Sequence, residues 1–173
     1  MLFEILLTRI FVDGGILTAI LAMVLVGMLF FNPRIALSDY PDDVKAAVPP
    51  RTQKELRQGI LLSIPTLLIC LAIPLYSVWL VKQQIGGNLT YGITFVTIFG
   101  EYFQASMFDL LVLDLWLFYT WTPKFLVLPG TEGMAGYKDY RPHLKAQLTT
   151  GNLLLVVFSA LLAFFPFISI RID

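Results

Sequence analysis

Four long apolar runs, separated by shorter polar stretches, make up the hydrophobic pattern of this chain. A helix needs roughly 20 mostly apolar residues to cross a bilayer, and three of the runs reach that length while the fourth nearly does. Strands of a transmembrane barrel need only about 10 alternating residues, so these runs indicate helices. We therefore predict four transmembrane helices, over residues 14–31, 59–81, 97–121 and 151–170.

These spans account for most of the chain and leave no room for a separate soluble domain. We predict an all-α integral membrane protein in which residues 1–173 form one four-helix bundle. Residues 1–12 are also apolar, although Glu4 and Arg9 interrupt them and Asp13 follows. This segment either extends the first span or forms a short helix at the membrane interface.

Positive charge is concentrated in the two long connections, residues 32–58 and 123–149. They contain nine of the twelve Lys and Arg residues. Short loops rich in Lys and Arg stay on the cytoplasmic side of a membrane. The pattern predicts that both connections face the cytoplasm and that both termini lie outside it, in a plasma or bacterial inner membrane.

Both connections carry signals of ordered structure. Thr52 stands three residues before Glu55, which is the pattern of a capping box at a helix start. The second connection contains several glycines that mark tight turns: Gly130, Gly133 and Gly136. We expect the two connections to be structured and to pack together beneath the bundle.

Composition supports the membrane assignment and excludes several functions. Hydrophobic residues make up 57% of the chain and charged residues only 14%, whereas soluble domains are about a quarter charged. Twelve basic and twelve acidic residues cancel, so no broad basic surface exists for nucleic acid. The single cysteine, Cys70, cannot form an internal disulfide or a zinc cluster. The common catalytic and nucleotide-binding motifs are absent, and we predict no cofactor and no metal.

The third predicted span carries three carboxylates: Glu101, Asp109 and Asp114. A charged side chain at the bilayer centre costs about 2.5 kcal/mol or more, so each is a functional candidate. Trp116, Tyr119 and Trp121 resemble an aromatic belt at the cytoplasmic interface. This belt places Asp114 just inside the interface and Asp109 deepest. Glu101 then lies toward the outer surface, which we expect its side chain to reach.

Helical angles separate these groups. At about 100° per residue of a regular α-helix, Asp109 and Asp114 point about 140° apart and do not bind one metal together. Polar groups surround most of the helix, which predicts either a central position in the bundle or contact of one side with another protein. The predicted set that binds a ligand or a proton is Asp109, Glu101, Gln104, Tyr102 and Ser106.

A structural role is the alternative for each carboxylate. Asp109 could carry a proton and donate it to a backbone carbonyl that Pro65 or Pro74 leaves free in the second span. Asp114, close to the interface, could form a salt bridge with a Lys or Arg of the connections.

His143, the only histidine, lies just before the fourth span. Imidazole titrates near neutrality, so His143 and Asp114 are the candidate catalytic pair, although an exposed histidine at a helix start is common. The basic residues around it are candidates for holding an anionic lipid headgroup: Lys138, Arg141 and Lys145.

Three functions remain open from these residues. The leading hypothesis is a transport-type or binding protein, or a component of one, in which Asp109 holds a proton, a cation, a polar ligand or a basic group of a partner. The first alternative is an enzyme acting on a lipid or isoprenoid headgroup at the cytoplasmic face. The second is a structural subunit of a larger membrane complex, and four spans favour an oligomer if the chain transports a solute.

Overall fold

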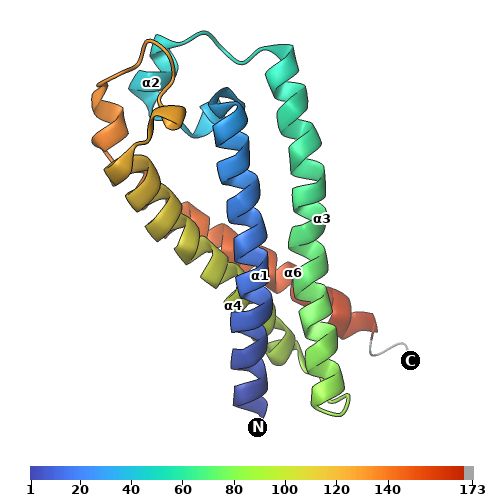
Figure 1. Cartoon of the computed structure of the whole chain (residues 1–173). Coiled ribbons are helices and arrows are strands. Elements are labelled where there is room, and N and C mark those ends of the chain that lie inside the picture. Colours follow the sequence, from blue (N-terminus) through green and yellow to red (C-terminus); the bar gives the residue numbers. More distant parts are fainter. Residues whose placement is uncertain (170–173) are drawn as a thin grey trace.

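The computed structural model describes residues 1–169, and every regular element in this range is helical (Figure 1). Four helices of the described chain are long and apolar enough to cross a membrane: Leu2–Phe31, Gln53–Gln84, Tyr91–Trp121 and Arg141–Pro166. The predicted helical class and the number of candidate spans are confirmed. Four such helices indicate an integral membrane protein. The predicted end of the last span, Ile170, lies outside the described residues.

Helix α1, Leu2–Phe31, is continuous from the start of the chain. Residues 2–12 therefore do not form a separate N-terminal helix, because Glu4 and Arg9 interrupt the apolar pattern without breaking the backbone. The helix ends at Asn32, whose side chain accepts a hydrogen bond from the amide of Arg34 (3.2 Å) and starts the 3-10 helix η1, Pro33–Asp39.

Helix α3, Gln53–Gln84, starts at the capping box expected from the sequence. The Thr52 hydroxyl accepts from the Glu55 amide at 3.3 Å, and a Glu55 oxygen accepts from the Thr52 amide at 2.7 Å. Pro74, inside the helix, has no amide hydrogen to offer the carbonyl of Cys70 four residues earlier. The hydroxyl of Tyr102 donates to that carbonyl at 2.6 Å.

The third candidate span has two parts. An α-helix, α4, covers Tyr91–Phe108, and a π-helix, η2, continues it from Asp109 to Trp121. Hydrogen bonds in a π-helix join residues five positions apart, and such segments are rare and frequent at functional sites. Thr122, with φ of 50°, ends the helix in the left-handed region.

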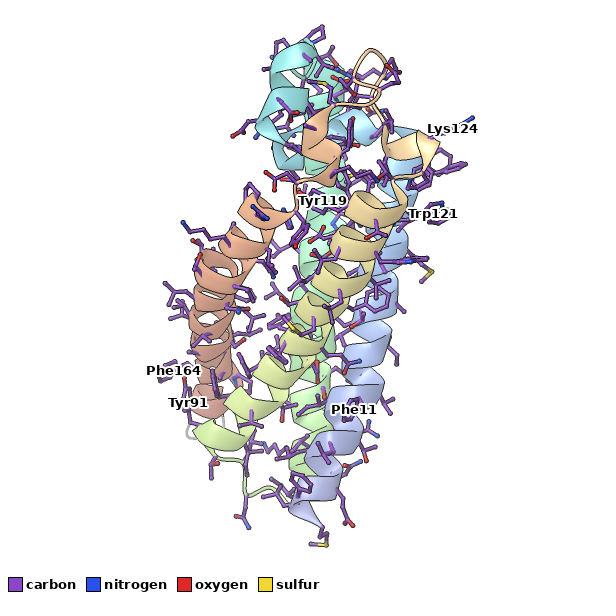
Figure 2. All side chains as sticks on the ribbon, turned by 90° about the vertical axis from the view of Figure 1, so that its left-hand side faces the viewer. Phe11, Tyr91, Tyr119, Trp121, Lys124 and Phe164 are labelled. Atoms are coloured by element: carbon purple, nitrogen blue, oxygen red, sulfur yellow. The ribbon has the colours of Figure 1, made fainter. Side chains whose placement is uncertain are left out.

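The fourth candidate span is also composite. It consists of α5, Arg141–Ala146, a π-helical turn η5, Gln147–Gly151, and α6, Asn152–Ser169. Figure 2 shows that Tyr91 and Phe164 meet where α4 begins and α6 approaches its end, and their ring centroids are 4.8 Å apart. Tyr119, Trp121 and Lys124 lie together at the opposite end of the molecule.

Glycines allow α1 and α4 to pack closely. A Cβ atom on Gly14 would stand 3.1 Å from the Cα of Glu101, and one on Gly100 would overlap the side chain of Ile10. The two backbones therefore approach at a level that contains Glu101 and Gln104, and this approach positions one of the two polar regions described below.

The two long connections meet at the end of the molecule opposite the N-terminus (Figure 1). The buried hydroxyl of Tyr40 donates to the carbonyl of Leu126 at 2.8 Å. Burial raises the pKa of Tyr40 above its ordinary value, so this hydroxyl keeps its proton and remains a donor. Helix α2, Asp42–Ala47, is tied to the 3-10 helix η4, Ala135–Lys138, because the Gly136 amide donates to Asp43 at 2.9 Å. The short 3-10 helix η3, Lys124–Leu126, completes this end.

Candidate functional site

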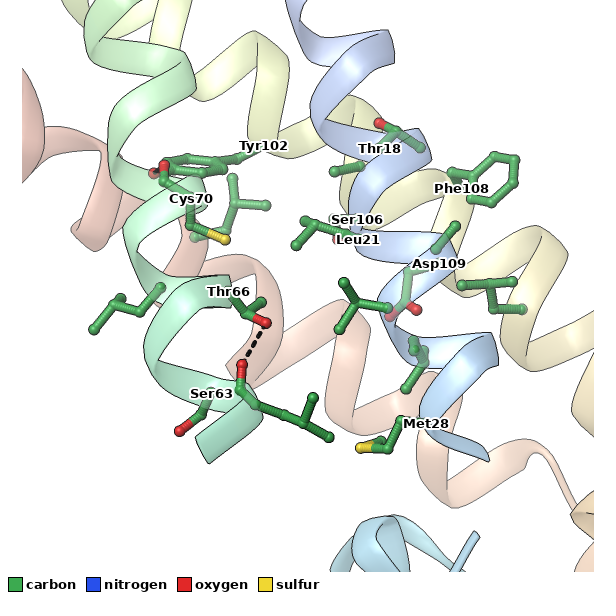
Figure 3. A pocket seen from close by; sticks show the side chains of 18 of the residues that line it. Thr18, Leu21, Met28, Ser63, Thr66, Cys70, Tyr102, Ser106, Phe108 and Asp109 are labelled. Atoms are coloured by element: carbon green, nitrogen blue, oxygen red, sulfur yellow. Dashed lines mark hydrogen bonds between the residues drawn. The ribbon is translucent and has the colours of Figure 1, made fainter. Parts of the chain in front are cut away.

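A cavity of about 680 Å³ lies between α1, α3, the α4–η2 helix and the start of the fourth span (Figure 3). Most of its wall is apolar, with side chains such as Leu21, Leu25, Leu67 and Phe158. A few polar side chains also line it: Thr18, Ser63, Thr66, Tyr102, Ser106, Asp109 and Gln147. A largely apolar cavity with a few polar groups is typical of a binding site for a small organic molecule.

Asp109 is the only carboxylic acid among the described residues that line this cavity, which contain no Lys, Arg or His. In Figure 3 it points into the space between α1 and α3, opposite Tyr102 and Cys70. Its neighbours are already paired: Tyr102 donates to Cys70, and Gln147 donates to the hydroxyl of Ser106 at 2.7 Å. The Asp109 carboxyl makes no hydrogen bond within the described residues, so it is the polar group available to a ligand.

A second, smaller space of about 160 Å³ lies on the other side of Asp109, toward the connections. It is lined by Asp109, Asp114 and His143 together with Asp39 and Tyr40 of the first connection. Nε2 of His143 stands 2.7 Å from Oδ2 of Asp114, within hydrogen-bonding distance. The two side chains are 33% and 19% exposed, so the pair lies at the boundary between the helices and the connections.

The shared space corrects the helical angles expected from the sequence. The separation of about 140° between Asp109 and Asp114 assumed a regular α-helix, but both belong to η2. Because π-helical hydrogen bonds join residues five positions apart, these two carboxylates lie about one turn apart on the same side. Within residues 1–169 no group of three His, Cys, Asp or Glu side chains is arranged to hold a metal ion.

A third space, of about 530 Å³, lies among the connections and shares His143, Asp39 and Tyr40 with the second. Its lining contains more acidic than basic side chains: Asp39, Asp42, Asp43 and Asp139 against Lys45 and His143. The three spaces thus follow one another through shared residues. His143 lines both the space of about 530 Å³ among the connections and the small space of about 160 Å³. Asp109 lines both the small space and the large apolar cavity.

Glu101 lies elsewhere and differs from the sequence expectation. It does not reach a surface, because its side chain is completely buried between α1, α3 and α4. Arg9 and Asp13 of α1 form an ion pair beside it, with 3.5 Å between their nitrogen and oxygen atoms. Neither Glu101 oxygen makes a hydrogen bond within the described residues, and neither does the hydroxyl of Ser77, which faces it from α3.

The predicted ligand-binding set therefore divides into two groups. Tyr102, Ser106 and Asp109 line the large cavity. Glu101 and Gln104 face α1 instead. With its amide turned to the orientation that satisfies both ends, Gln104 donates to the Ile10 carbonyl (2.9 Å) and accepts from the Gly15 amide (3.2 Å). The two groups are close in sequence, but the side of the helix that carries Glu101 and Gln104 is closed by the tight packing of α1 on α4.

The three basic residues predicted to hold a lipid headgroup, Lys138, Arg141 and Lys145, do not form one group. Lys138 donates to the carbonyls of Tyr119 (3.1 Å) and Thr120 (3.2 Å) and to the hydroxyl of Thr122 (2.8 Å). It therefore caps the carboxyl end of η2, where a cation is favourable. Arg141 and Lys145 are exposed, and none of the three lines the spaces described above.

Sequence reasoning missed several residues of these regions. Asp39 and Tyr40 come from the first connection, which was expected to pack against the second, but the sequence does not signal which of its residues lie beside His143. Arg9 and Asp13 did carry a signal, since a pair of opposite charges four residues apart in an apolar helix marks one helical face. Ser77 had none, because a lone serine in a long apolar run is common.

No family model, curated protein or solved structure matches this chain. The geometry of its own residues therefore has to support any functional assignment.

Proposed function

We propose that this chain is a membrane protein that binds an amphipathic ligand taken from the bilayer. The apolar part of the ligand occupies the 680 Å³ cavity, and its cationic or hydrogen-bond-donating group meets Asp109. The observation that carries the proposal is the position of Asp109, which lines both the apolar cavity and the polar space beside His143. This is the arrangement that a molecule with an apolar tail and a polar head requires.

The proposal includes an orientation. The connections that contain nine of the twelve Lys and Arg residues meet at one end of the molecule, which favours a cytoplasmic location for that end. The polar head would then lie near the cytoplasmic face, with the N-terminus on the other side. Aromatic side chains at this end, including the exposed Trp116 and Trp121, fit an interfacial belt.

Charge favours a cationic head over an anionic one. Asp109, Asp114 and Asp39 line the small space, and His143 is the only basic side chain among the described residues that line it. An anionic head would meet these carboxylates, whereas Lys138 is held at the end of η2. A protonated amine or quaternary ammonium group is therefore the best match, and a neutral hydrogen-bond donor is the next.

Two photoreactive probes with the same alkyl chain test the proposal, one with a trimethylammonium head and one with a sulfonate head. In lipid nanodiscs the cationic probe should label the wild-type protein more strongly. Asp109→Asn should reduce its labelling about tenfold, since an ion pair of roughly 1.4 kcal/mol corresponds to that factor. Glu132→Gln, an exposed acid in the second connection, is the matched control and should label as the wild type does.

Equal labelling by the two probes, with no effect of Asp109→Asn, would refute the proposal. Ala22→Phe tests the contribution of the cavity independently of the Asp109 charge, because Ala22 lines the apolar wall and a larger side chain would fill the space. This variant should lose labelling by the cationic probe although Asp109 is intact.

An enzyme acting on such a ligand is the second candidate function. The contact of 2.7 Å between His143 and Asp114 favours it, because a carboxylate that orients an imidazole is a common arrangement in general acid–base catalysis. In this case His143→Gln should retain probe binding while a lipid substrate is no longer converted. Retained conversion would exclude His143 as the catalytic base.

A purely structural role in a larger complex is less well supported. Glu101, Asp109 and Asp114 face helices and connections of their own chain, so they do not form an acidic docking face. A single stable assembly with a second protein, seen by native mass spectrometry in mild detergent, would favour that role.

A further inference from the structure

A second polar region, distinct from the cavity, is formed by Arg9 and Asp13 of α1, Ser77 of α3 and Glu101 of α4. We call it the buried cluster. Five of its side-chain nitrogen and oxygen atoms are buried without a hydrogen bond within the described residues: Arg9 Nε, Asp13 Oδ2, Ser77 Oγ and both Glu101 oxygens. Buried polar groups are normally hydrogen-bonded, so this concentration requires an explanation.

The charges of the cluster do not balance if Glu101 is ionised. Arg9 and Asp13 already neutralise each other as an ion pair at 3.5 Å. An ionised Glu101 would then add an unpaired charge at a position with no exposed surface. Burying an isolated carboxylate costs so much that such groups gain a proton instead.

The elements packed around Glu101 contribute few other titratable groups. Arg9 and Asp13 act on it from α1, and Ser77 is its polar neighbour on α3. Tyr102 is the adjacent titratable residue on α4 itself. Residues 152–169 of α6 contain no titratable side chain.

We propose that Glu101 is a proton-binding site within the membrane, enclosed by α1, α3 and α4 and separate from the cavity that Asp109 lines. A proton on one Glu101 oxygen turns an acceptor into a donor. Ser77 Oγ and Asp13 Oδ2 are acceptors that lack a hydrogen bond within the described part of the chain, although Asp13 Oδ2 is also the ion-pair oxygen that faces Arg9. The Ser77 hydroxyl can in turn donate to the other Glu101 oxygen. One proton thus removes the unpaired charge and supplies the missing hydrogen bonds.

A metal cation fits this site less well than a proton. The guanidinium of Arg9 is always charged and stands beside the carboxyl, so it repels a metal ion. Hard cations also need about six oxygen ligands, while the cluster, as far as the structure describes the chain, offers four oxygens without a hydrogen bond, one of which already faces Arg9. The close packing of Gly14 on the Glu101 backbone leaves little room for an ion and its water.

Infrared spectroscopy of the full chain in lipid nanodiscs tests this proposal. At neutral pH the wild type should show the C=O stretching band of a protonated carboxyl, with the shift on H₂O to D₂O exchange that identifies it. The band should be lost in Glu101→Gln and retained in Asp109→Asn. Ser77→Ala should keep the band but shift its frequency, because the hydrogen-bond partner of the acid is removed.

Three outcomes would overturn the proposal. The first is a band of equal intensity in the wild type and in Glu101→Gln. The second is loss of the band when sodium replaces choline at constant ionic strength, which would assign the site to a metal cation. The third is failure of Glu101→Gln to fold, because a neutral amide of the same shape should replace a neutral acid without loss of the melting temperature. Labelling by the cationic probe is independent of all three.

Discussion

The α4–η2 helix presents acidic side chains to two regions with different properties. At the level of η2, Asp109 and Asp114 both line the small space beside the connections, and Asp114 is hydrogen-bonded to His143. At the level of α4, Glu101 is enclosed by three helices and has no hydrogen bond within the described residues. The backbone accounts for the difference: two glycines bring α1 against α4 around Glu101, whereas the π-helix places Asp109 beside the cavity.

An intramembrane carboxylate can therefore contact a ligand or hold a proton, depending on the space around it. Asp109 is available to a molecule that enters the cavity. Glu101 is available only to a proton unless the helices separate.

The largest expected effect is the loss of the positive charge in the buried cluster. Arg9→Met leaves Asp13 without its partner, and breaking a buried ion pair costs about 3–5 kcal/mol of folding free energy. We expect a clear fall in the melting temperature in detergent. Arg9→Met combined with Asp13→Leu removes both charges and should recover most of the loss. A double variant no more stable than the single one would show that the pair is not the source of the effect.

The second effect tests the helix contact that encloses Glu101. Gly14→Leu places a side chain against the Glu101 backbone, where even a Cβ would stand at 3.1 Å. Overpacking of this kind costs about 1–3 kcal/mol, measured as a lower melting temperature. Gly27→Leu is the matched control on the same helix, because no atom lies within 4 Å of a Cβ there. Equal losses in the two variants would contradict the close packing of α1 and α4.

The third effect concerns the pair near the connections. His143→Gln removes the contact with Asp114, and hydrogen bonds to charged groups contribute about 1.5–3 kcal/mol. Since His143 is one-third exposed, the lower end of that range applies. In a double-mutant cycle, Asp114→Asn should then cost less in the His143→Gln background than in the wild type. Additive losses would show that the two side chains do not interact.

The smallest effect concerns the Cys70 carbonyl, which Pro74 leaves without a backbone donor in α3. Tyr102→Phe removes the donor to the Cys70 carbonyl, and such hydrogen bonds in membrane proteins average about 0.6 kcal/mol. Pro74→Ala restores the backbone donor, so the same substitution should cost nothing in that background. An unchanged cost there would mean that the proline does not create the need for Tyr102.

The sequence allowed the helices to be predicted because a bilayer-crossing helix needs a long apolar run, and four such runs are visible. The capping box at Thr52 and Glu55 was predictable for a similar local reason. The sequence also singled out Asp109 as the acid to test first, because the free-energy cost of placing a carboxylate in lipid depends on the residue type and its depth alone.

The remaining features depend on non-local packing. A regular 100° periodicity placed Asp109 and Asp114 on different sides, and nothing in the local sequence signals the π-helix that aligns them. Burial of Glu101 depends on two glycines and a serine from three helices. The contact of Asp39 and Tyr40 with the His143 region requires the first connection to fold over the second, which depends on contacts such as that between Asp43 and Gly136.

Mapping the labelled residues shows whether the ligand enters the cavity beside Asp109. After irradiation in nanodiscs, the trimethylammonium alkyl probe should modify the cavity wall of α1 and α3, within residues 18–28 and 59–70, and Asp109→Asn should remove this modification while leaving the bilayer-facing labelling intact. Labelling confined to the outer surface of the helices, and unchanged by Asp109→Asn, would contradict the assignment of this cavity as a ligand site.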